Sequence, residues 1–452
     1  MSFSDWSSFL ADVLVVVAGV FVAAILVLSA RNPRPLLWLA LLAALAVLPR
    51  TILVLVPPSV PWHVGITTES VSLKTYSAAI LLAIIYVAAR GRHKLPVSLW
   101  LYVLVAVIVF ATSWFFLWPH TQGVASGMLH IATSIAALLV GAALAHADSY
   151  ASDEAVVAVS IFMIVAVQVP IVLLQIVGIQ LFPTDQATQL FEGDRPNGTF
   201  GHPGTMGKVF LLLLVILLPL TQSRCRRARR WSIAAVVLMC PLVVITASRT
   251  NSVAIGATVV LWIVFSSRVS LGRKLIVLAG VSGVIVASIP LWAERIATGE
   301  DGSTRARLLE VGLEQIALRP FTGTGPNNYI DLVSQTEATA AAGWPVHNAF
   351  LLGWAELGVF GVAILFLPYL AVLFLSVRSL RTDRGPQALA VLSSLPGLLA
   401  ICVTGWGLLA EMLPLWMFVT GAAIAGLSGV TRRRYPADQA RTKSSYLLNG
   451  RR

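Results

Sequence analysis

The sequence has 452 residues, of which 57% are hydrophobic and only 12% are charged, with a formal net charge of +12. This composition excludes a water-soluble globular protein, because about a quarter of the residues in such a protein are charged. The positive charge does not indicate nucleic-acid binding, since the arginines cluster in short links between hydrophobic runs, where the topology determinants of membrane proteins lie. An integral membrane protein is the class that remains.

Hydrophobic runs long enough to cross a bilayer recur along the chain. They are expected to be helices, because an unpaired backbone amide in lipid costs several kcal/mol and the alternating pattern of a membrane barrel is absent. The expected fold class is all-α: a polytopic integral membrane protein with about 12–13 transmembrane helices. The predicted spans lie near residues 9–30, 36–56, 71–89, 97–117, 124–147, 155–178, 205–221, 231–247, 250–266, 275–293, 349–376, 387–408 and 412–430.

The basic clusters predict the orientation of these spans. With this assignment they all fall on one side, which is the cytoplasm by the positive-inside rule. The clusters are Arg31 with Arg34, and residues 90–94, 224–230, 268–274, 378–384 and 432–434. One link on the same side, residues 148–154, carries no positive charge, and Pro49 and Arg50 fall near the middle of the second span. The N-terminal third therefore has the weakest topology signal.

Two links on the opposite side, residues 179–204 and 294–348, are much longer than the others. Long polar loops in a compact protein are usually functional or disordered, and these two are rich in Gly, Pro, Arg and carboxylates. Apolar residues at helical spacing predict an amphipathic helix over 304–318, before Pro320. We divide the chain into N-terminal transmembrane helices 1–178, a transmembrane region 179–430 containing both outer loops, and a basic cytoplasmic tail 431–452.

The first outer loop and the next outer turn each supply a candidate site. The loop ends Arg195-Pro-Asn-Gly-Thr-Phe-Gly-His202-Pro-Gly and runs into a predicted helix, whose unpaired N–H groups suit an anion. An ordinary loop-to-helix joint is the alternative. The tight turn Ala247-Ser-Arg249-Thr-Asn251 places an arginine between two spans, where it could hold an anion or only reach the lipid headgroups.

The second outer loop carries further candidates. It contains Thr304-Arg305-Ala-Arg307 and then Gly323-Thr-Gly325. The Gly-x-Gly pattern is a weak ligand-binding motif, and an ordinary turn is the alternative interpretation. The loop closes with His347-Asn348, where the chain re-enters the membrane. Histidine titrates near neutrality and can take a proton from a hydroxyl, although a helix cap or a hydrogen-bonded structural role would also explain it.

The sequence offers little support for a metal site, and no cofactor is expected. It has no HExxH motif and no Cys/His ligand pattern. The closely spaced carboxylates Glu192 and Asp194 in the first outer loop make only a weak case for Mg²⁺ or Mn²⁺.

In order along the chain, four short motifs resemble the O-antigen ligase and O-antigen polymerase superfamily. They are Arg195-Pro-x-Gly-Thr-Phe-Gly-His-Pro, Ser248-Arg249, Arg305 followed by Pro320 and Gly323-x-Gly325, and His347-Asn348 with Glu356-Leu-Gly358. Two positions depart from the family pattern: Gly204 stands where Asn often follows His-Pro, and Asn251 stands where a small residue is usual. Residues 1–178 match the family only in being hydrophobic helices.

Members of this superfamily are bacterial inner-membrane glycosyltransferases of the helical, GT-C-like kind, whose donor is a glycan on undecaprenyl diphosphate. The resemblance implies that Arg249 and Arg305 hold the diphosphate, with Arg195 as a further contact and Arg307 as the alternative to Arg305. It also implies that His347 lies near the acceptor hydroxyl. His202, Asn348 and Glu356 are expected as further substrate contacts.

The expected function is therefore transfer of a glycan from that donor to a hydroxyl of a glycan, glycolipid or protein, as a polymerase or a ligase. Arginines can stabilise the charge on the leaving diphosphate without a metal, and His347 can serve as the base. The expected location is the bacterial inner membrane, with the site facing outward and no nucleic-acid partner. A transporter or flippase of lipid-linked saccharides is the alternative, kept open by the intramembrane Glu356 and Arg50.

Overall fold

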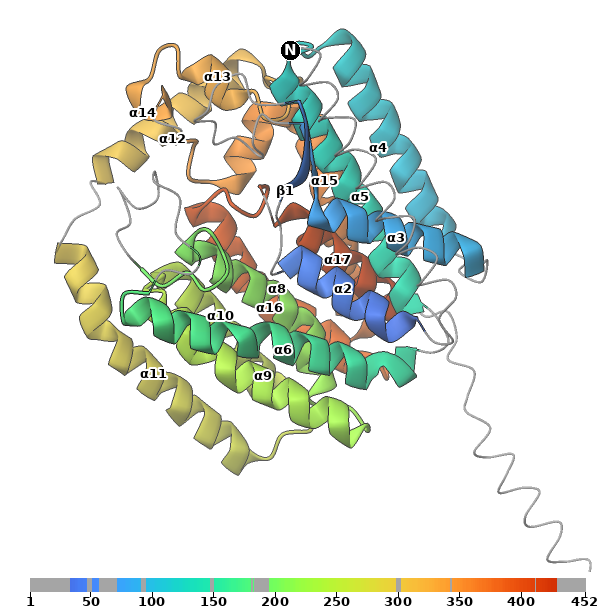
Figure 1. Ribbon diagram of the computed structural model, residues 1–452, viewed down its shortest axis with the longest axis vertical. Coiled ribbons are helices and arrows are strands. Elements are labelled where there is room, and N and C mark those ends of the chain that lie inside the picture. Colours follow the sequence, from blue (N-terminus) through green and yellow to red (C-terminus); the bar gives the residue numbers. More distant parts are fainter. Residues whose placement is uncertain are drawn as a thin grey trace, which may run out of the picture.

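The computed structural model describes residues 33–46, 51–56, 71–90, 95–146, 150–179, 182, 195–297, 302–341, 344–410 and 412–428. In these ranges seven helices are long and apolar enough to cross a membrane, which confirms the all-α polytopic class (Figure 1). They are α4 (Val97–Phe116), α5 (Gln122–His146), α6 (Tyr150–Ile176), α8 (Pro203–Leu220), α9 (Arg226–Ile245), α15 (Ala349–Ser379) and α16 (Gly385–Thr404). Four shorter apolar helices accompany them: α2 (Arg34–Ala46), α3 (Thr75–Arg90), α10 (Arg249–Phe265) and α17 (Leu413–Ser428). A further helix, α11, spans Leu271–Ala297.

The predicted span 36–56 is wrong. Helix α2 ends at Ala46, and Thr51–Val56 form strand β1, which pairs in antiparallel fashion with β2 (Val71–Lys74). The segment Thr-Ile-Leu-Val-Leu-Val is rich in β-branched residues, and Pro49 before it disfavours a continuous helix. The predicted span 9–30 and the tail 431–452 lie outside the described residues, so the total of about 12–13 spans stays a prediction.

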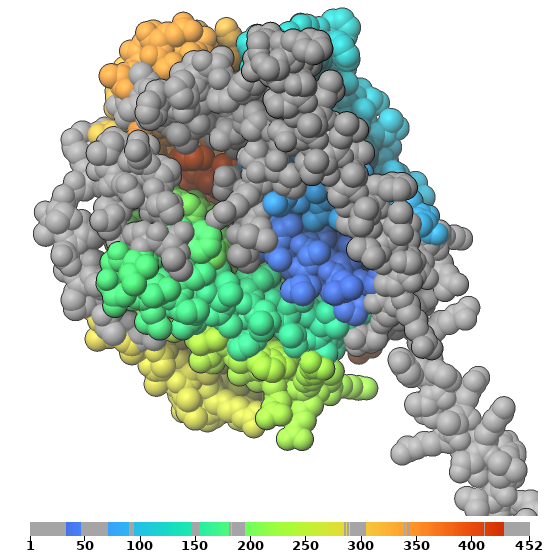
Figure 2. All heavy atoms as spheres, in the orientation of Figure 1, coloured from blue at the N-terminus to red at the C-terminus, as the bar shows by residue number. Residues whose placement is uncertain are grey.

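The second long loop is largely helical. Helix α12 (Gly302–Leu318) confirms the predicted amphipathic helix, and α13 (Tyr329–Val333) and α14 (Ala338–Ala341) follow it. The inner face of α12 buries Val311 and Ile316 in a small core with Tyr329 and with the start of α15. In Figure 2 the atoms of α12–α14 gather at one end of the molecule, away from the basic start of α9.

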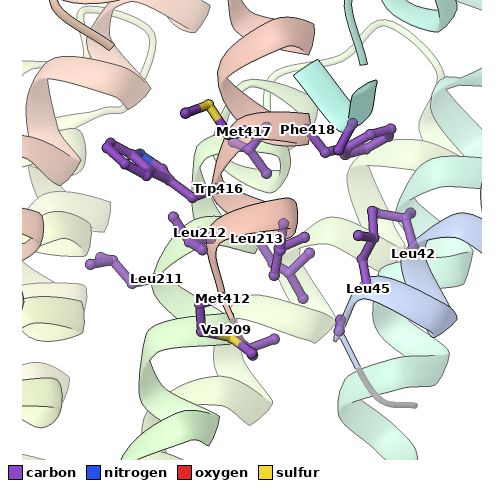
Figure 3. Packing of buried hydrophobic residues seen from close by; sticks show 14 of the residues in the cluster. Leu42, Leu45, Val209, Leu211, Leu212, Leu213, Met412, Trp416, Met417 and Phe418 are labelled. Atoms are coloured by element: carbon purple, nitrogen blue, oxygen red, sulfur yellow. The ribbon is translucent and has the colours of Figure 1, made fainter. Parts of the chain in front are cut away.

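The main core lies where α17 packs against α5 and α8. A Cβ atom on Gly421 of α17 would lie 2.0 Å from the carbonyl oxygen of Leu138, and one on Gly141 of α5 would lie 2.1 Å from that of Phe418. Small residues at such positions let two membrane helices approach backbone to backbone. Figure 3 shows the large side chains that fill the space around this contact: Leu42, Leu45, Val209, Leu211, Leu212, Leu213, Met412, Trp416, Met417 and Phe418.

The acidic link before α6 receives its positive charge from another helix. Asp153 pairs with Arg34 at the start of α2, with 2.7 Å between carboxylate and guanidinium. Glu154 accepts a hydrogen bond from the hydroxyl of Ser223, in the link before the basic start of α9. This explains why the link 148–154 needs no arginine of its own, and it brings the three links to the same end of the helix bundle.

Candidate active site

The first outer loop joins α8 through a histidine cap. His202 is the N-cap residue of α8, and its Nδ1 accepts a hydrogen bond of 2.9 Å from the backbone N–H of Gly204. Because Nδ1 accepts here, a neutral ring carries its proton on Nε2. The helix begins at Pro203, as the loop-to-helix reading of this segment predicts.

Two glutamines of α6 hold this loop in place, and the sequence analysis missed both. The Gln175 side-chain oxygen accepts from the N–H groups of Asn197 and Gly198 at 3.0 and 2.8 Å. The Gln168 oxygen accepts from the N–H of Thr199 at 2.9 Å. The signal was two amides spaced seven residues apart on one face of a spanning helix, where polar side chains are costly and usually have a role.

The loop lies against the turn between α9 and α10. Nη1 of Arg195 reaches the carbonyl oxygen of Thr246 at 3.4 Å, and Thr246 is the residue at which α9 ends. Ser248 then caps α10, so Arg249 is the first residue of that helix. Arg195 and Arg249 thus lie at the same joint between α9 and α10, and their role in binding a diphosphate stays a prediction.

Arg249 has an uncommitted guanidinium. It is half-buried, and no residue that the structure describes forms a hydrogen bond or ion pair with its side chain. A partly buried charge without a partner is unfavourable in the absence of a counter-ion. The position suits an anionic ligand, because the backbone N–H groups at the start of a helix such as α10 favour negative charge.

The two departures from the family pattern touch each other. The Asn251 amide donates a hydrogen bond of 2.8 Å to the carbonyl oxygen of Gly204, which lies two residues after His202. Asn251 also fills the space beside Gly207, where a Cβ would come 2.4 Å from that of Asn251. Asn251 therefore lies in the contact between α8 and α10.

In the second outer loop, the two glycine motifs form one structure. We call residues 319–328 the docking loop. Gly358 has φ 67° and breaks α15, which leaves the carbonyl oxygens of Ala355 and Glu356 without helical partners. They accept from the N–H groups of Thr324 and Gly325 in the docking loop, at 2.9 and 2.8 Å. Gly323-x-Gly325, whose glycines have φ 66° and 97°, is thus the segment that completes the break at Glu356-Leu-Gly358.

Glu356 lies behind the docking loop and is fully buried. One oxygen of its carboxyl group accepts a hydrogen bond of 2.9 Å from the backbone N–H of Asn327, a residue with φ 62°. The side chain therefore supports the loop from inside the protein, and its role as a substrate contact stays a prediction.

Replacing Gly358 by alanine is expected to destabilise the protein by about 2–5 kcal/mol. The added Cβ would lie 2.0 Å from the carbonyl oxygen of Phe321, and the backbone angles at this position suit glycine alone. Thermal unfolding of the detergent-purified variant measures the effect. Gly256→Ala in α10 is the matched control, because its Cβ would meet nothing closer than 3.7 Å. A Gly358→Ala protein that melts with the wild type would show that the loop does not dock on the break.

The start of α15 carries His347 and Asn348. Asn348 is the N-cap residue, and its side-chain oxygen accepts from the N–H groups of Phe350 and Leu351 at 3.0 and 3.1 Å. His347 is half-buried, and its ring lies parallel to that of Trp344 with centroids 5.4 Å apart. Its Nδ1 lies 3.0 Å from the carbonyl oxygen of Pro345. A carbonyl can only accept, so Nδ1 carries the proton and Nε2 is the basic nitrogen of the neutral ring.

The structure separates the two arginines of α12. Arg307 forms ion pairs with Glu310 and Glu337, at 2.8 and 3.0 Å. Arg305 is exposed, and a spacing of two residues directs it to a different side of the helix. Arg307 is thus engaged within the protein, and the choice between Arg305 and Arg307 as the diphosphate contact stays a prediction.

A lysine inside α8 is a further charged residue that the sequence analysis missed. Lys208 follows Gly204 by one helical turn, and its Nζ would lie 2.4 Å from a Cβ atom at position 407, where the chain has glycine. The signal was a lysine within a predicted span, which by itself suggests a functional site. Gly407 makes room for its ammonium group between α16 and α17.

The predicted residues form two groups at the ends of neighbouring helices. Arg195, His202 and Arg249 lie where α8 and α10 begin, and His347 and Asn348 lie where α15 begins, next to α12 with Arg305. Helix α16 packs against α8, α10 and α15 and so connects the groups. Among the described residues, no three His, Cys, Asp or Glu side chains are arranged to hold a metal. Glu192, Asp194 and Arg50 lie outside those residues.

Comparison with known proteins agrees with the resemblance inferred from the motifs. Residues 234–366 match the family model described as O-antigen ligase. The matched region contains Arg249, Arg305, His347 and Glu356, whereas Arg195 and His202 precede it. No curated protein matches the chain. The resemblance inferred from the motifs is therefore confirmed for residues 234–366, which match the O-antigen ligase family model.

Proposed function

We propose that this protein is a glycosyltransferase that moves a glycan from an undecaprenyl-diphosphate-linked donor to an acceptor hydroxyl. The observation that carries the proposal is the half-buried guanidinium of Arg249, which has no partner among the described residues. Arg249 follows by three residues Thr246, whose carbonyl oxygen accepts a hydrogen bond from Arg195. A diphosphate supplies the missing counter-charge. Arginine suits this role because its planar fork stays charged and can contact two phosphate oxygens at once.

In the proposed reaction, the acceptor oxygen forms a bond to the sugar C1 while the bond from C1 to the diphosphate oxygen breaks. Negative charge then develops on the diphosphate, where Arg249 and Arg305 stabilise it. The proton of the acceptor hydroxyl passes to Nε2 of His347, the basic nitrogen set by the contact of Nδ1 with Pro345. A direct displacement inverts the configuration at C1. The arginines are sufficient for charge stabilisation, so the mechanism does not call for a metal.

The site is proposed to face away from the cytoplasm, in the inner membrane of a bacterium. The basic starts of α2 and α9 lie at one end of the helix bundle, and by the positive-inside rule this end is cytoplasmic. A donor lipid can then enter sideways between the helices, with its diphosphate at the outer interface. The acceptor can be a separate glycan, glycolipid or protein, as for a ligase, or another copy of the growing chain, as for a polymerase.

One observation favours a second candidate, a transporter or flippase for the same lipid-linked saccharide. Transporters often use broken helices at their binding sites, and α15 is broken at Gly358 beside the buried Glu356. In this protein, however, the docking loop fills the break with its own hydrogen bonds, so the exposed backbone groups are already satisfied. This favours the transferase.

The deciding experiment supplies the purified protein in nanodiscs with undecaprenyl-diphosphate-linked oligosaccharide in the presence of EDTA. The expected result is release of undecaprenyl diphosphate together with a lengthened or newly attached glycan. If the intact donor instead crosses the membrane of sealed proteoliposomes without bond cleavage, the protein is a transporter. Loss of turnover on chelation alone would reject the metal-independent mechanism and direct attention to Glu192 and Asp194.

A further inference from the structure

A cavity adjoins the docking loop. It has a volume of about 770 Å³ and lies between the end of α4, with the turn that follows it, and the segment from the docking loop to α13. Phe115 and Phe116 line it from the α4 side. Arg319, Asn328 and Asp331 line it from the docking loop and α13. None of these five residues belongs to the groups assigned to the diphosphate and the acceptor hydroxyl.

The two walls of this cavity are joined by one hydrogen bond, and a second bond lies within the docking loop. Trp118, in the turn after α4, donates from Nε1 to the carbonyl oxygen of Thr322 in the docking loop at 2.7 Å, and its side chain is almost fully buried. The Asn328 side chain donates to the carbonyl oxygen of Thr324 at 2.9 Å. The cavity is therefore a built feature of the fold, formed where two segments distant in sequence are joined.

The chemistry of the walls selects the ligand. The Phe115 and Phe116 side chains are 67% and 81% exposed, so their rings are accessible to a ligand. Planar polar groups face the same space from Arg319, Asp331 and Gln335. A sugar ring offers an apolar C–H face to aromatic rings and a rim of hydroxyls to amides, carboxylates and guanidinium groups. A lipid tail would make no favourable contact with the charged groups, and the negative charge of Asp331 disfavours a phosphate.

The aromatic pair is also unusual for a membrane anchor. The aromatic belts of membrane proteins use Trp and Tyr, whose polar tips reach water, whereas Phe115 and Phe116 have no polar tip. Lipid can cover part of their surface, since they end the spanning helix α4, but the charged and amide groups that line the same cavity call for a ligand that is also polar.

We propose that this cavity binds a saccharide segment of the acceptor. The inference rests on the proposed function and names a second contact for the same substrate. The docking loop forms one wall of the cavity, and its other side is hydrogen-bonded to α15 at residues 355–359, on the helix that begins beside His347. A glycan held in the cavity is thus bound to the same rigid unit that carries the proposed base.

The test measures direct binding, without donor lipid and without turnover. Short fragments of the envelope polysaccharide of the source organism, labelled at the reducing end, are titrated into the full-length protein in nanodiscs. Phe116→Ala and Asp331→Asn are each expected to weaken binding by roughly 3- to 10-fold. Phe321→Ala is the matched control, because Phe321 is 63% exposed on the docking loop but does not line the cavity. It should bind as the wild type does.

The outcomes separate this inference from the proposed function. If the wild type binds no fragment, or if the two cavity variants bind as tightly as the control, the cavity is not a saccharide site, whatever the transfer assay gives. If the wild type binds fragments with the expected dependence on Phe116 and Asp331 but transfers no glycan, the proposed function fails and the saccharide site stands. A Gln335→Ala variant, altered at an exposed side chain, decides the matter if either cavity variant fails to fold.

Discussion

Replacing His347 by alanine is expected to lower glycan transfer by about 10²- to 10⁴-fold and to leave donor binding unchanged. The variant loses the ring whose Nδ1 is held by the carbonyl oxygen of Pro345 and whose Nε2 is therefore basic. It keeps the arginines that are proposed to hold the diphosphate. Initial rates at saturating donor, together with equilibrium binding of the donor to the same nanodiscs, separate the two effects.

His202→Ala is the matched control for this prediction. Both histidines lie just before a helix, but Nδ1 of His202 accepts from Gly204 and serves as the cap of α8. Its loss should cost about 1 kcal/mol of stability and have a much smaller effect on the rate. The wild-type rate should also fall as the pH drops through the range in which histidine is protonated, whereas the His347→Ala rate should not. A wild-type rate in His347→Ala, or a rate in that variant that still falls at acidic pH as the wild-type rate does, would reject His347 as the base.

The spanning helices and the joints of the site were predictable because each depends on local sequence. Hydrophobic runs of sufficient length define α4, α5 and α15, and the amphipathic spacing defines α12. The helix starts at Pro203 and Arg249 follow from a polar or glycine-containing segment before an apolar run. The exception is residues 36–56, where length and hydrophobicity alone could not distinguish a helix from a short helix followed by a strand.

The interior of the site was not predictable, because it depends on contacts between segments distant in sequence. From the sequence, Gly323-x-Gly325 and Glu356-Leu-Gly358 each indicate only a short turn. The structure shows that the first segment supplies the hydrogen bonds that are missing at the break in the second. The same is true of Gln175, whose amide is an isolated polar group until Asn197 and Gly198 are seen beside it. A buried polar group indicates that a partner exists, but its sequence does not say which residue that partner is.

The contact between Gly204 and Asn251 shows how such pairs can mislead. Taken one at a time, each departure from the family pattern weakens the assignment of the first loop. In the structure, the Asn251 amide donates a hydrogen bond to the carbonyl oxygen of Gly204, so the residues at the two departures contact each other. This contact positions the start of α8 against α10, and Arg249 is the first residue of α10.

Replacing Arg249 by alanine is expected to reduce transfer by about 10²- to 10³-fold, through loss of charge stabilisation on the leaving diphosphate. The half-buried side chain has no partner among the described residues, so its removal breaks no hydrogen bond or ion pair with them, and the melting temperature should change little. Arg249→Lys should recover only part of the activity, because a lysine keeps the charge but cannot make two parallel contacts. The comparison uses kcat/KM for the donor, measured alongside thermal unfolding of each variant.

Variants of the two arginines of α12, Arg305 and Arg307, test the second proposed diphosphate contact. Arg305→Ala is expected to weaken donor use strongly, whereas Arg307→Ala should leave it close to the wild type, because Arg307 is paired with Glu310 and Glu337. If Arg307→Ala weakens donor use and Arg305→Ala does not, Arg307 is the diphosphate contact, and its two ion pairs form only in the absence of the donor. Wild-type activity in both Arg249→Ala and Arg305→Ala would remove the basis for a diphosphate clamp at this end of the protein. The uncommitted guanidinium of Arg249 would then need another anion, such as a lipid headgroup at the membrane surface.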